Sequence, residues 1–363
     1  MRLAFSILSL VLCASLAQAD IVIGVAGPMT GQYQSFGEQM LRGVQSAIDE
    51  INAHGGISGE YLKLDQGDDG CDARKTEETA HKFVTDGASV IIGHFCSNAA
   101  LIGAKIYEAA GIPMIAPSAS LPSLAEGAGW NVIRLASRDD HQGDFAAARI
   151  NHDYANGQVG LLDDGSASAK ALVARLTATL AKPLALTISF KPDQSDFSGL
   201  VKEVQTKNID IIYFAANAGD AGRIAAALAQ GGVSAQFFGP DTILADEYGA
   251  KAGMASEGTM ASFSTDPQSY HRAKAMVEAL KIAGTNADGA TLPSYAALQL
   301  YATAAVQVGP KNGHAIADWL RSGTSIETVL GDLKFDKNGE VQPPRFTWYR
   351  WSNGSYSAET LKK

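Results

Sequence analysis

Short runs of hydrophobic residues alternate along the chain with longer stretches in which apolar side chains recur at helical spacing. The runs predict parallel strands buried on both faces, and the stretches between them predict helices with one apolar face. The strands recur roughly every 25 residues, about the length of a βα unit. The pattern predicts an α/β fold with two doubly wound parallel sheets, joined near 134–140. The expected strands lie at 21–25, 61–64, 90–92, 113–116, 159–162, 186–190, 209–214, 237–239 and 259–263.

The C-terminal part of the chain is predicted to be mostly helical and to end in a hairpin. Residues 333–335 and 346–351 are expected to pair across a turn at 336–339. The acidic positions near this turn do not fit the ligand frame of a calcium loop, so no metal is expected there. Helices with an apolar face are expected at 270–283, 294–307 and 315–321.

Residues 1–19 have the pattern of a secretory signal peptide. Arg2 supplies a positive charge, residues 3–12 form an apolar run, and 17–19 (Ala-Gln-Ala) form a small-residue cleavage motif. The apolar run is too short to span a membrane. We therefore expect export, with cleavage between Ala19 and Asp20.

Three cysteines occur in the sequence, and two of them follow the predicted leader. Cys13 allows a lipoprotein interpretation, but Leu12 fits poorly the small residue expected before a lipidated cysteine. An exported protein that retains Cys71 and Cys96 most simply forms one disulfide, which would contribute about 3 kcal/mol. Two free buried thiols, or half of a metal site, are the alternatives. The histidines show no metal-binding spacing.

The composition is that of a globular protein with an acidic balance. Hydrophobic residues make up 46%, charged residues 18%, and the net charge is −9, which argues against nucleic acid as a partner. The chain has no Gly-x-Ser-x-Gly, no Walker loop and no His-Glu-x-x-His. No catalytic residue or cofactor is predicted, and an exported hydrolase is the weakest hypothesis. The acidic pairs at 139–140 and 163–164 are interpreted as solvated turns.

Two strands end in loops that contain hydroxyl side chains. Ser97 follows the strand at 90–92, and Ser120 follows the strand at 113–116. Parallel strands place such loops on one edge of the sheet, where open α/β sheets bind ligands. Taken alone, Ser97 is more typical of a helix cap and Asp241 of a turn. Together they could bind a zwitterion, because hydroxyls and amides suit a carboxylate and Asp241 suits an ammonium.

Six segments share an order and spacing with one known family. They are 51–57 (Ile-Asn-Ala-His-Gly-Gly-Ile), 69–72 (Asp-Gly-Cys-Asp), 93–97 (Gly-His-Phe-Cys-Ser), 117–120 (Pro-Ser-Ala-Ser), 238–241 (Phe-Gly-Pro-Asp) and 295–299 (Tyr-Ala-Ala-Leu-Gln). Across essentially the whole mature chain, the sequence resembles the leucine/isoleucine/valine-binding proteins of bacterial ABC importers.

This resemblance implies a type I periplasmic binding protein fold with two lobes, a three-segment hinge and a cleft. Lobe 1 would comprise 20–138 and 265–343, and lobe 2 would comprise 139–264 and 344–363. The resemblance also implies a Cys71–Cys96 disulfide.

Family roles carry over by matching position. Ser97 and Ser120 would bind the ligand carboxylate, while the carbonyl oxygen of Ser118 and the carboxylate of Asp241 would hold its ammonium.

The chain departs from the family at three expected pocket positions. Phe36 stands where branched-chain members have Tyr, and keeps an apolar wall. Ser168 and Asn217 replace two further aromatic residues, which implies a roomier or more polar pocket. The ligand would be a branched-chain amino acid or a larger or more polar one.

The resemblance implies the substrate-binding component of an ABC importer in the periplasm. Such a protein would be a monomer without enzymatic activity that traps its ligand by hinge closure and delivers it to a membrane permease. The alternative is a ligand sensor of the same fold, which would report an amino acid, amide or γ-amino acid to a receptor or regulator.

Overall fold

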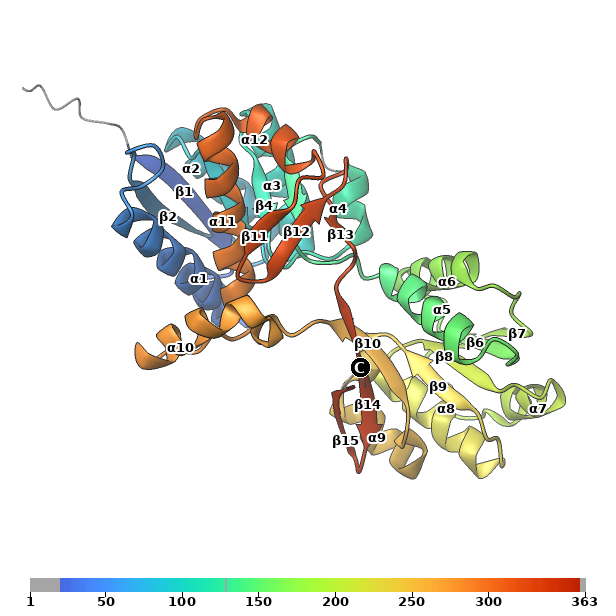
Figure 1. The fold of residues 1–363 in the computed structure, drawn as a ribbon. Coiled ribbons are helices and arrows are strands. Elements are labelled where there is room, and N and C mark those ends of the chain that lie inside the picture. Colours follow the sequence, from blue (N-terminus) through green and yellow to red (C-terminus); the bar gives the residue numbers. More distant parts are fainter. Residues whose placement is uncertain (1–19, 128, 360–363) are drawn as a thin grey trace, which may run out of the picture.

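The computed structural model describes residues 20–127 and 129–359, so the predicted leader, with Cys13, lies outside the described residues. The described chain forms two lobes, each organised around its own sheet (Figure 1). The predicted α/β fold with two doubly wound sheets is confirmed. No helix in these residues is long and apolar enough to cross a membrane.

The first sheet has five parallel strands in the order β2-β1-β3-β4-β5. These strands are β1 (Ile21–Gly27), β2 (Leu62–Asp68), β3 (Val90–Gly93), β4 (Met114–Ala116) and β5 (Val132–Arg134). One face is covered by α2 (Ala73–Thr85), α3 (Ser97–Ala109) and α4 (Pro122–Gly127). The buried strands are almost wholly apolar, as expected for a sheet covered on both faces.

The other face of the first sheet is covered by α1 (Gln34–Ala53) and by chain that returns late in the sequence. The returning elements are α10 (Lys274–Ile282), α11 (Thr291–Val308), α12 (Gly313–Leu320) and the small sheet β11 (Ile326–Thr328), β12 (Gly331–Phe335) and β13 (Val341–Gln342). Helices α1 and α11 pack closely because Gly43 has no side chain. A Cβ atom there would lie 2.0 Å from the carbonyl oxygen of Thr291.

The second sheet has the order β15-β14-β10-β9-β8-β6-β7. Its strands are β6 (Val159–Asp163), β7 (Leu186–Ser189), β8 (Ile211–Ala215), β9 (Gln236–Gly239), β10 (Met260–Ser264), β14 (Phe346–Ser352) and β15 (Ser355–Ala358). One face packs against α5 (His141–Asp153) and α6 (Ala167–Thr179). The opposite face packs against α7 (Ser198–Thr206), α8 (Ala218–Gln230) and α9 (Asp246–Ala252).

The predicted C-terminal hairpin between 333–335 and 346–351 is wrong. Strand β12 pairs with β13, whereas β14 pairs antiparallel with β10 and β15 in the second sheet. Pro343 and Pro344 follow β13, and proline has no N–H to continue a ladder. Trp348 and Trp351 then pack into the cores on opposite faces of the second sheet, which places β14 there.

Three segments connect the two sheets. The chain crosses after β5, after β10 and after β13 (Figure 1). We call these segments, at 135–140, 265–270 and 343–345, the crossovers. They lie beside the carboxyl ends of the parallel strands, so their side chains are available to any site between the lobes.

A disulfide joins Cys71, in the loop after β2, to Cys96, the residue before α3. The predicted pairing is confirmed. The alternatives, two free thiols or half of a metal site, are therefore wrong. Beneath it, the fully buried Asp69 accepts a hydrogen bond from the backbone N–H of Cys71 and contacts the His94 ring at 2.6 Å. The other His94 nitrogen lies 3.1 Å from the Tyr107 hydroxyl, whose pKa is raised by burial and by the charge of Asp69.

Replacing both cysteines with serine should lower the free energy of unfolding by about 3 kcal/mol, because the unfolded chain regains the entropy of an open loop. Urea denaturation with and without reductant measures the effect. Reductant should destabilise the wild type and leave the double variant unchanged. A double variant as stable as the oxidised wild type would contradict the prediction.

Candidate functional site

A cavity of about 370 Å³ lies between the two lobes, beside the crossovers. Its walls include Phe36, Ser118 and Ser120 from the first lobe, Asp139 from the first crossover and Asp241 from the second lobe. Four of these five residues were expected site residues, so the fold brings together positions up to two hundred residues apart in sequence. The carboxyl edges of the two sheets meet at this cavity, as the strand pattern predicts.

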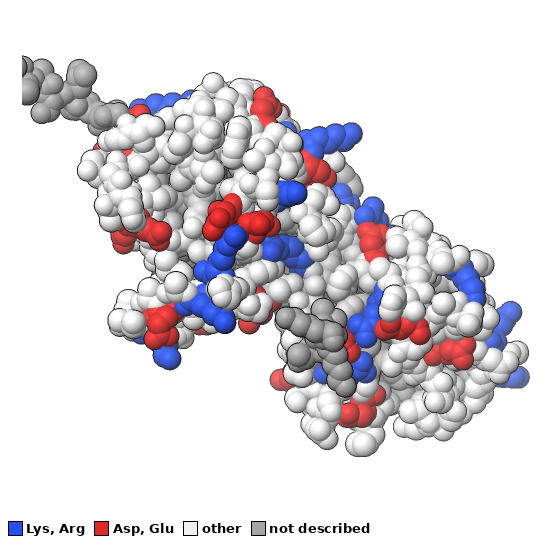
Figure 2. All heavy atoms as spheres, in the orientation of Figure 1, with Lys and Arg blue, Asp and Glu red and all other residues white. Residues whose placement is uncertain are grey.

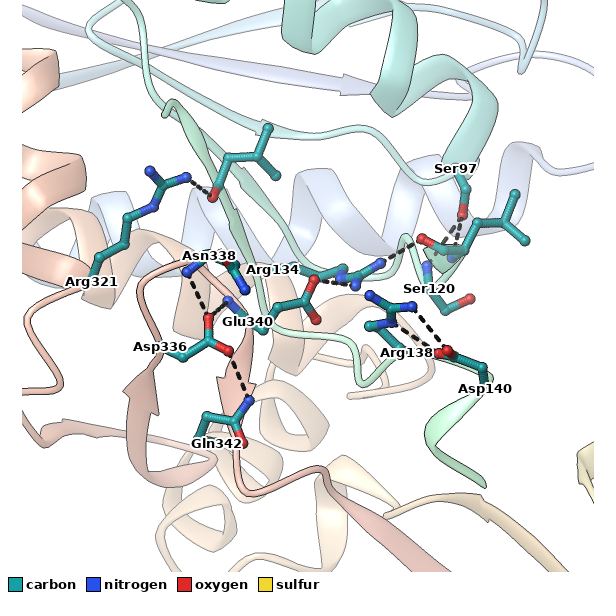
Figure 3. A network of polar contacts seen from close by, with 12 residues as sticks. Ser97, Ser120, Arg134, Arg138, Asp140, Arg321, Asp336, Asn338, Glu340 and Gln342 are labelled. Carbon is teal, nitrogen blue, oxygen red and sulfur yellow. Dashed lines mark hydrogen bonds and ion pairs between the residues drawn. The ribbon is translucent and has the colours of Figure 1, made fainter. Parts of the chain in front are cut away.

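Ser97 supports the wall that Ser120 forms. Its Oγ accepts hydrogen bonds from the backbone N–H groups of Ser120, at 3.2 Å, and Leu121, at 3.3 Å (Figure 3). The cap interpretation of Ser97 is wrong, because Cys96 occupies the cap position of α3 and Ser97 is its first residue. Since the Ser97 oxygen accepts both contacts, its own O–H remains available to donate to a ligand.

Asp139 lies beside this wall. Its Oδ2 accepts a hydrogen bond from the Ser120 hydroxyl at 2.9 Å, and its N–H donates to the Ser120 carbonyl oxygen at 3.2 Å. Burial and the nearby charge of Asp241 raise the pKa of Asp139 to about 6, although the Ser120 hydrogen bond and Arg134 act in the opposite direction. The interpretation of 139–140 as a solvated turn is therefore wrong. Asp140 is buried and bound by Arg138 (Figure 3).

Asp241 faces the cavity from the second lobe. It begins the short 3-10 helix Asp241–Ile243 after β9. Gln142 of α5 donates to its Oδ1 at 3.0 Å, and the backbone N–H of Asp241 donates to Gln142 Oε1 at 3.1 Å. The buried Ser262 hydroxyl donates to the same Gln142 oxygen at 2.9 Å. Burial raises the pKa of Asp241, and its hydrogen-bonding partner is a neutral amide rather than a cation.

Phe36 forms part of an apolar wall. Its ring stacks on Phe95, with centroids 4.4 Å apart and planes 16° apart, and both rings line the cavity. Phe95 directly precedes the disulfide residue Cys96, so the bridge and the stack hold the same loop. The cavity thus combines hydroxyl groups, one apolar wall and two partly buried carboxylates.

The periplasmic binding protein family model matches residues 20–355. The chain belongs to this family. A protein of Brucella abortus (strain 2308) named Leu/Ile/Val-binding protein homolog 2 is 32% identical over 351 residues, which cover 94% of this chain and 95% of the relative. A Pseudomonas aeruginosa protein named amino acid binding protein is 32% identical over 361 residues, covering 98% of this chain and 96% of the relative.

The structure of a type 1 periplasmic binding protein from Bordetella pertussis has the same fold. Its TM-score is 0.67 at 19% identity, over 94% of this chain and all of that chain. The resemblance and the type I fold expected from the sequence are both confirmed.

Three expected site residues of this family member do not line the cavity: Ser97, which lies behind Ser120, and Ser168 and Asn217. Ser168 is exposed in the first turn of α6. Asn217 is the N-cap of α8, and its side chain accepts from the Asp220 N–H at 2.9 Å and donates to Asp220 Oδ2 at 2.7 Å. Because α6 and α8 follow the parallel strands β6 and β8, both residues share the carboxyl edge with Asp241.

A buried ion pair supports the Ser120 loop from below. Arg134 of β5 pairs with Glu340, and its Nη1 donates to the carbonyl oxygen of Leu121 at 2.7 Å (Figure 3). Both side chains are almost wholly buried. Replacing one partner alone would leave an uncompensated charge, so this pair holds the loop rather than offering charge to a ligand.

Sequence reasoning missed the site residues of the crossovers, among them Asp139, Tyr270 and Arg345. The acidic pair at 139–140 was the only signal in the sequence. The described residues contain no cluster of three or more histidine, cysteine or acidic side chains that could hold a metal ion. Charges of both signs are interspersed over the face in Figure 2, without a large basic patch.

The raised pKa of Asp139 predicts a pH dependence of stability. Between the ordinary pKa of 3.8 and about 6, the folded protein binds this proton more tightly than the unfolded chain does. The contribution of Asp139 to stability therefore falls as pH rises through this window. Relative to Asp139→Asn, the wild type should lose about 2 kcal/mol of unfolding free energy between roughly pH 4 and pH 7.

Urea denaturation across this range measures the difference between the two proteins. Asp49→Asn, on the exposed face of α1, serves as the matched control and should follow the wild-type curve. Parallel curves for the wild type and Asp139→Asn would rule out the assignment.

Proposed function

We propose that this protein is the substrate-binding component of an ABC importer and binds an amino acid between its lobes. The observation that carries the proposal is the pairing of groups in one cavity. Ser118 and Ser120 line it on one side, with the Ser97 hydroxyl bound to the Ser120 N–H, and Asp241 lines it from the other lobe.

These groups match the two ends of a zwitterion. The ligand carboxylate would accept from the Ser97 hydroxyl and from the Ser120 N–H, which now binds Ser97 Oγ. Its ammonium would donate to Asp241 and to the carbonyl oxygen of Ser118. Hydrogen bonds to charged groups are about twice as strong as neutral ones. Among the described residues, no cation forms an ion pair with the Asp241 carboxylate and competes with the ligand.

Hinge motion at the crossovers would complete the site. The proposed lobes are 20–138 with 265–343, and 139–264 with 344–363. Closure moves the edge that bears Ser168 and Asn217 towards the cavity, where these small polar residues would bound the ligand side chain opposite Phe36.

The family supports the proposed cellular setting. A leader cleaved between Ala19 and Asp20 would deliver the protein to the periplasm, where it works as a monomer with a membrane permease. It carries out binding and release, without enzymatic turnover. The two relatives whose names mention amino acids support the ligand class.

A thermal-shift panel of the twenty amino acids on the mature protein tests this function. At least one amino acid should raise the melting temperature, because a ligand that binds only the folded state stabilises it by mass action. If amino acids, amides and γ-amino acids all leave the melting temperature unchanged, the proposal fails.

Asp241→Ala should weaken binding of the amino acid identified by this panel by about 2–5 kcal/mol, since an ammonium in a closed cleft loses its carboxylate. Titration calorimetry measures the loss. Asp246→Ala, an exposed aspartate of α9 only five positions away, provides the control and should bind like the wild type. A loss below tenfold for Asp241→Ala would remove this residue from the site.

A further inference from the structure

The cavity contains a second polar group, separate from the residues assigned to the zwitterion. Arg345 of the third crossover and Tyr270 of the second line it together with Ser264 and Thr265. None of these four residues has a role in the proposed contacts to the ligand carboxylate or ammonium. Their chemistry therefore bears on the part of the ligand that differs among amino acids.

The guanidinium of Arg345 is held in a defined position. Its Nε donates to the Tyr270 hydroxyl at 2.8 Å, its Nη2 donates to the carbonyl oxygen of Leu330 at 2.7 Å, and its centre lies 4.4 Å from the Tyr270 ring centroid. The backbone N–H of Arg345 donates to Ser137 Oγ at 2.7 Å. Contacts to Tyr270 and Leu330 thus orient the guanidinium at the cavity wall, and the contact to Ser137 fixes the Arg345 backbone.

Arg345 and Tyr270 each retain a hydrogen-bond donor that no other described group uses. Among the described residues, Nη1 of Arg345 has no hydrogen-bond partner and no carboxylate forms an ion pair with this guanidinium. The Tyr270 oxygen already accepts from Arg345, so its own O–H is free to donate. A fixed cation beside a hydroxyl with a free O–H is complementary to a carbonyl or carboxylate oxygen, and not to an aliphatic side chain.

We propose that Arg345 and Tyr270 bind an oxygen acceptor at the end of the ligand side chain. The ligand is then an amino acid with a side-chain carboxylate or carboxamide rather than a branched aliphatic one. This inference rests on the proposed function and adds the ligand class to it.

The competing explanation gives Arg345 a purely structural role, as a brace between the third crossover and Leu330. The two explanations differ in what they imply for specificity. A brace affects all ligands alike, whereas a donor pair that meets the ligand discriminates strongly against analogues without an acceptor, because its polar groups are then left unpaired.

Titration calorimetry with L-glutamate, L-glutamine and L-norleucine tests the proposal on the mature protein. These side chains have similar length, and only norleucine lacks an acceptor. Glutamate or glutamine should bind at least tenfold more tightly than norleucine. Arg345→Met should weaken binding of the tighter of these two ligands at least tenfold. It should change the affinity for norleucine by less than threefold. A larger loss for glutamate than for glutamine identifies the carboxylate as the acceptor, and a larger loss for glutamine identifies the carboxamide.

Two further variants provide a second test of the donor pair and a matched control. Tyr270→Phe keeps the ring beneath the guanidinium and should weaken the acceptor-bearing ligand at least threefold. Arg350→Met makes the same substitution on the neighbouring strand β14, outside the cavity, and should bind like the wild type.

Norleucine binding as tight as that of both acceptor-bearing ligands would overturn the inference. So would an equal loss for all three ligands in Arg345→Met. If other amino acids bind but these three do not, the proposed function stands and the inference falls. If no amino acid binds the wild type, both fall.

Discussion

Parallel strands place all the loops at their carboxyl ends on one edge of a sheet, and two such edges face one cavity in this protein. This constraint brings Ser120, which follows β4, close to Asp241, which follows β9. The crossovers run beside the same edges, so Asp139 and Arg345 join the cavity as well. The polar character of the site is thus a consequence of strand direction.

The charges around the cavity fall into two classes. Arg134 pairs with Glu340 and Arg138 pairs with Asp140, so these four residues hold their segments in place (Figure 3). The carboxylates of Asp139 and Asp241 instead accept hydrogen bonds from neutral side chains, Ser120 and Gln142. Burial raises the pKa of both, and no described cation forms an ion pair with either carboxylate. A ligand ammonium would supply the missing positive charge. In a structural ion pair, by contrast, the protein itself supplies both charges.

Most of the fold could be predicted from local pattern. The buried strands are short apolar runs such as 90–92, and helices such as α1 bury one stripe of residues. The C-terminal hairpin could not be predicted, because β14 has the same strand character whichever sheet it joins. Strand β14 joins the second sheet because two prolines interrupt the chain after β13 and because its tryptophans pack on both faces of that sheet. Similarly, the role of Ser97 depends on Leu121, which lies 24 positions away.

The sequence by itself determined the α/β class, the disulfide residues and the family, because periodicity and motif spacing are properties of the chain alone. It also identified Ser118, Ser120, Phe36 and Asp241, which the fold brings to one cavity. Only the tertiary structure decided that Asp139 is part of the cavity wall and that Arg345 and Tyr270 line the same cavity. Burial and unpaired hydrogen-bond donors arise from residues distant in sequence, and no local pattern encodes them.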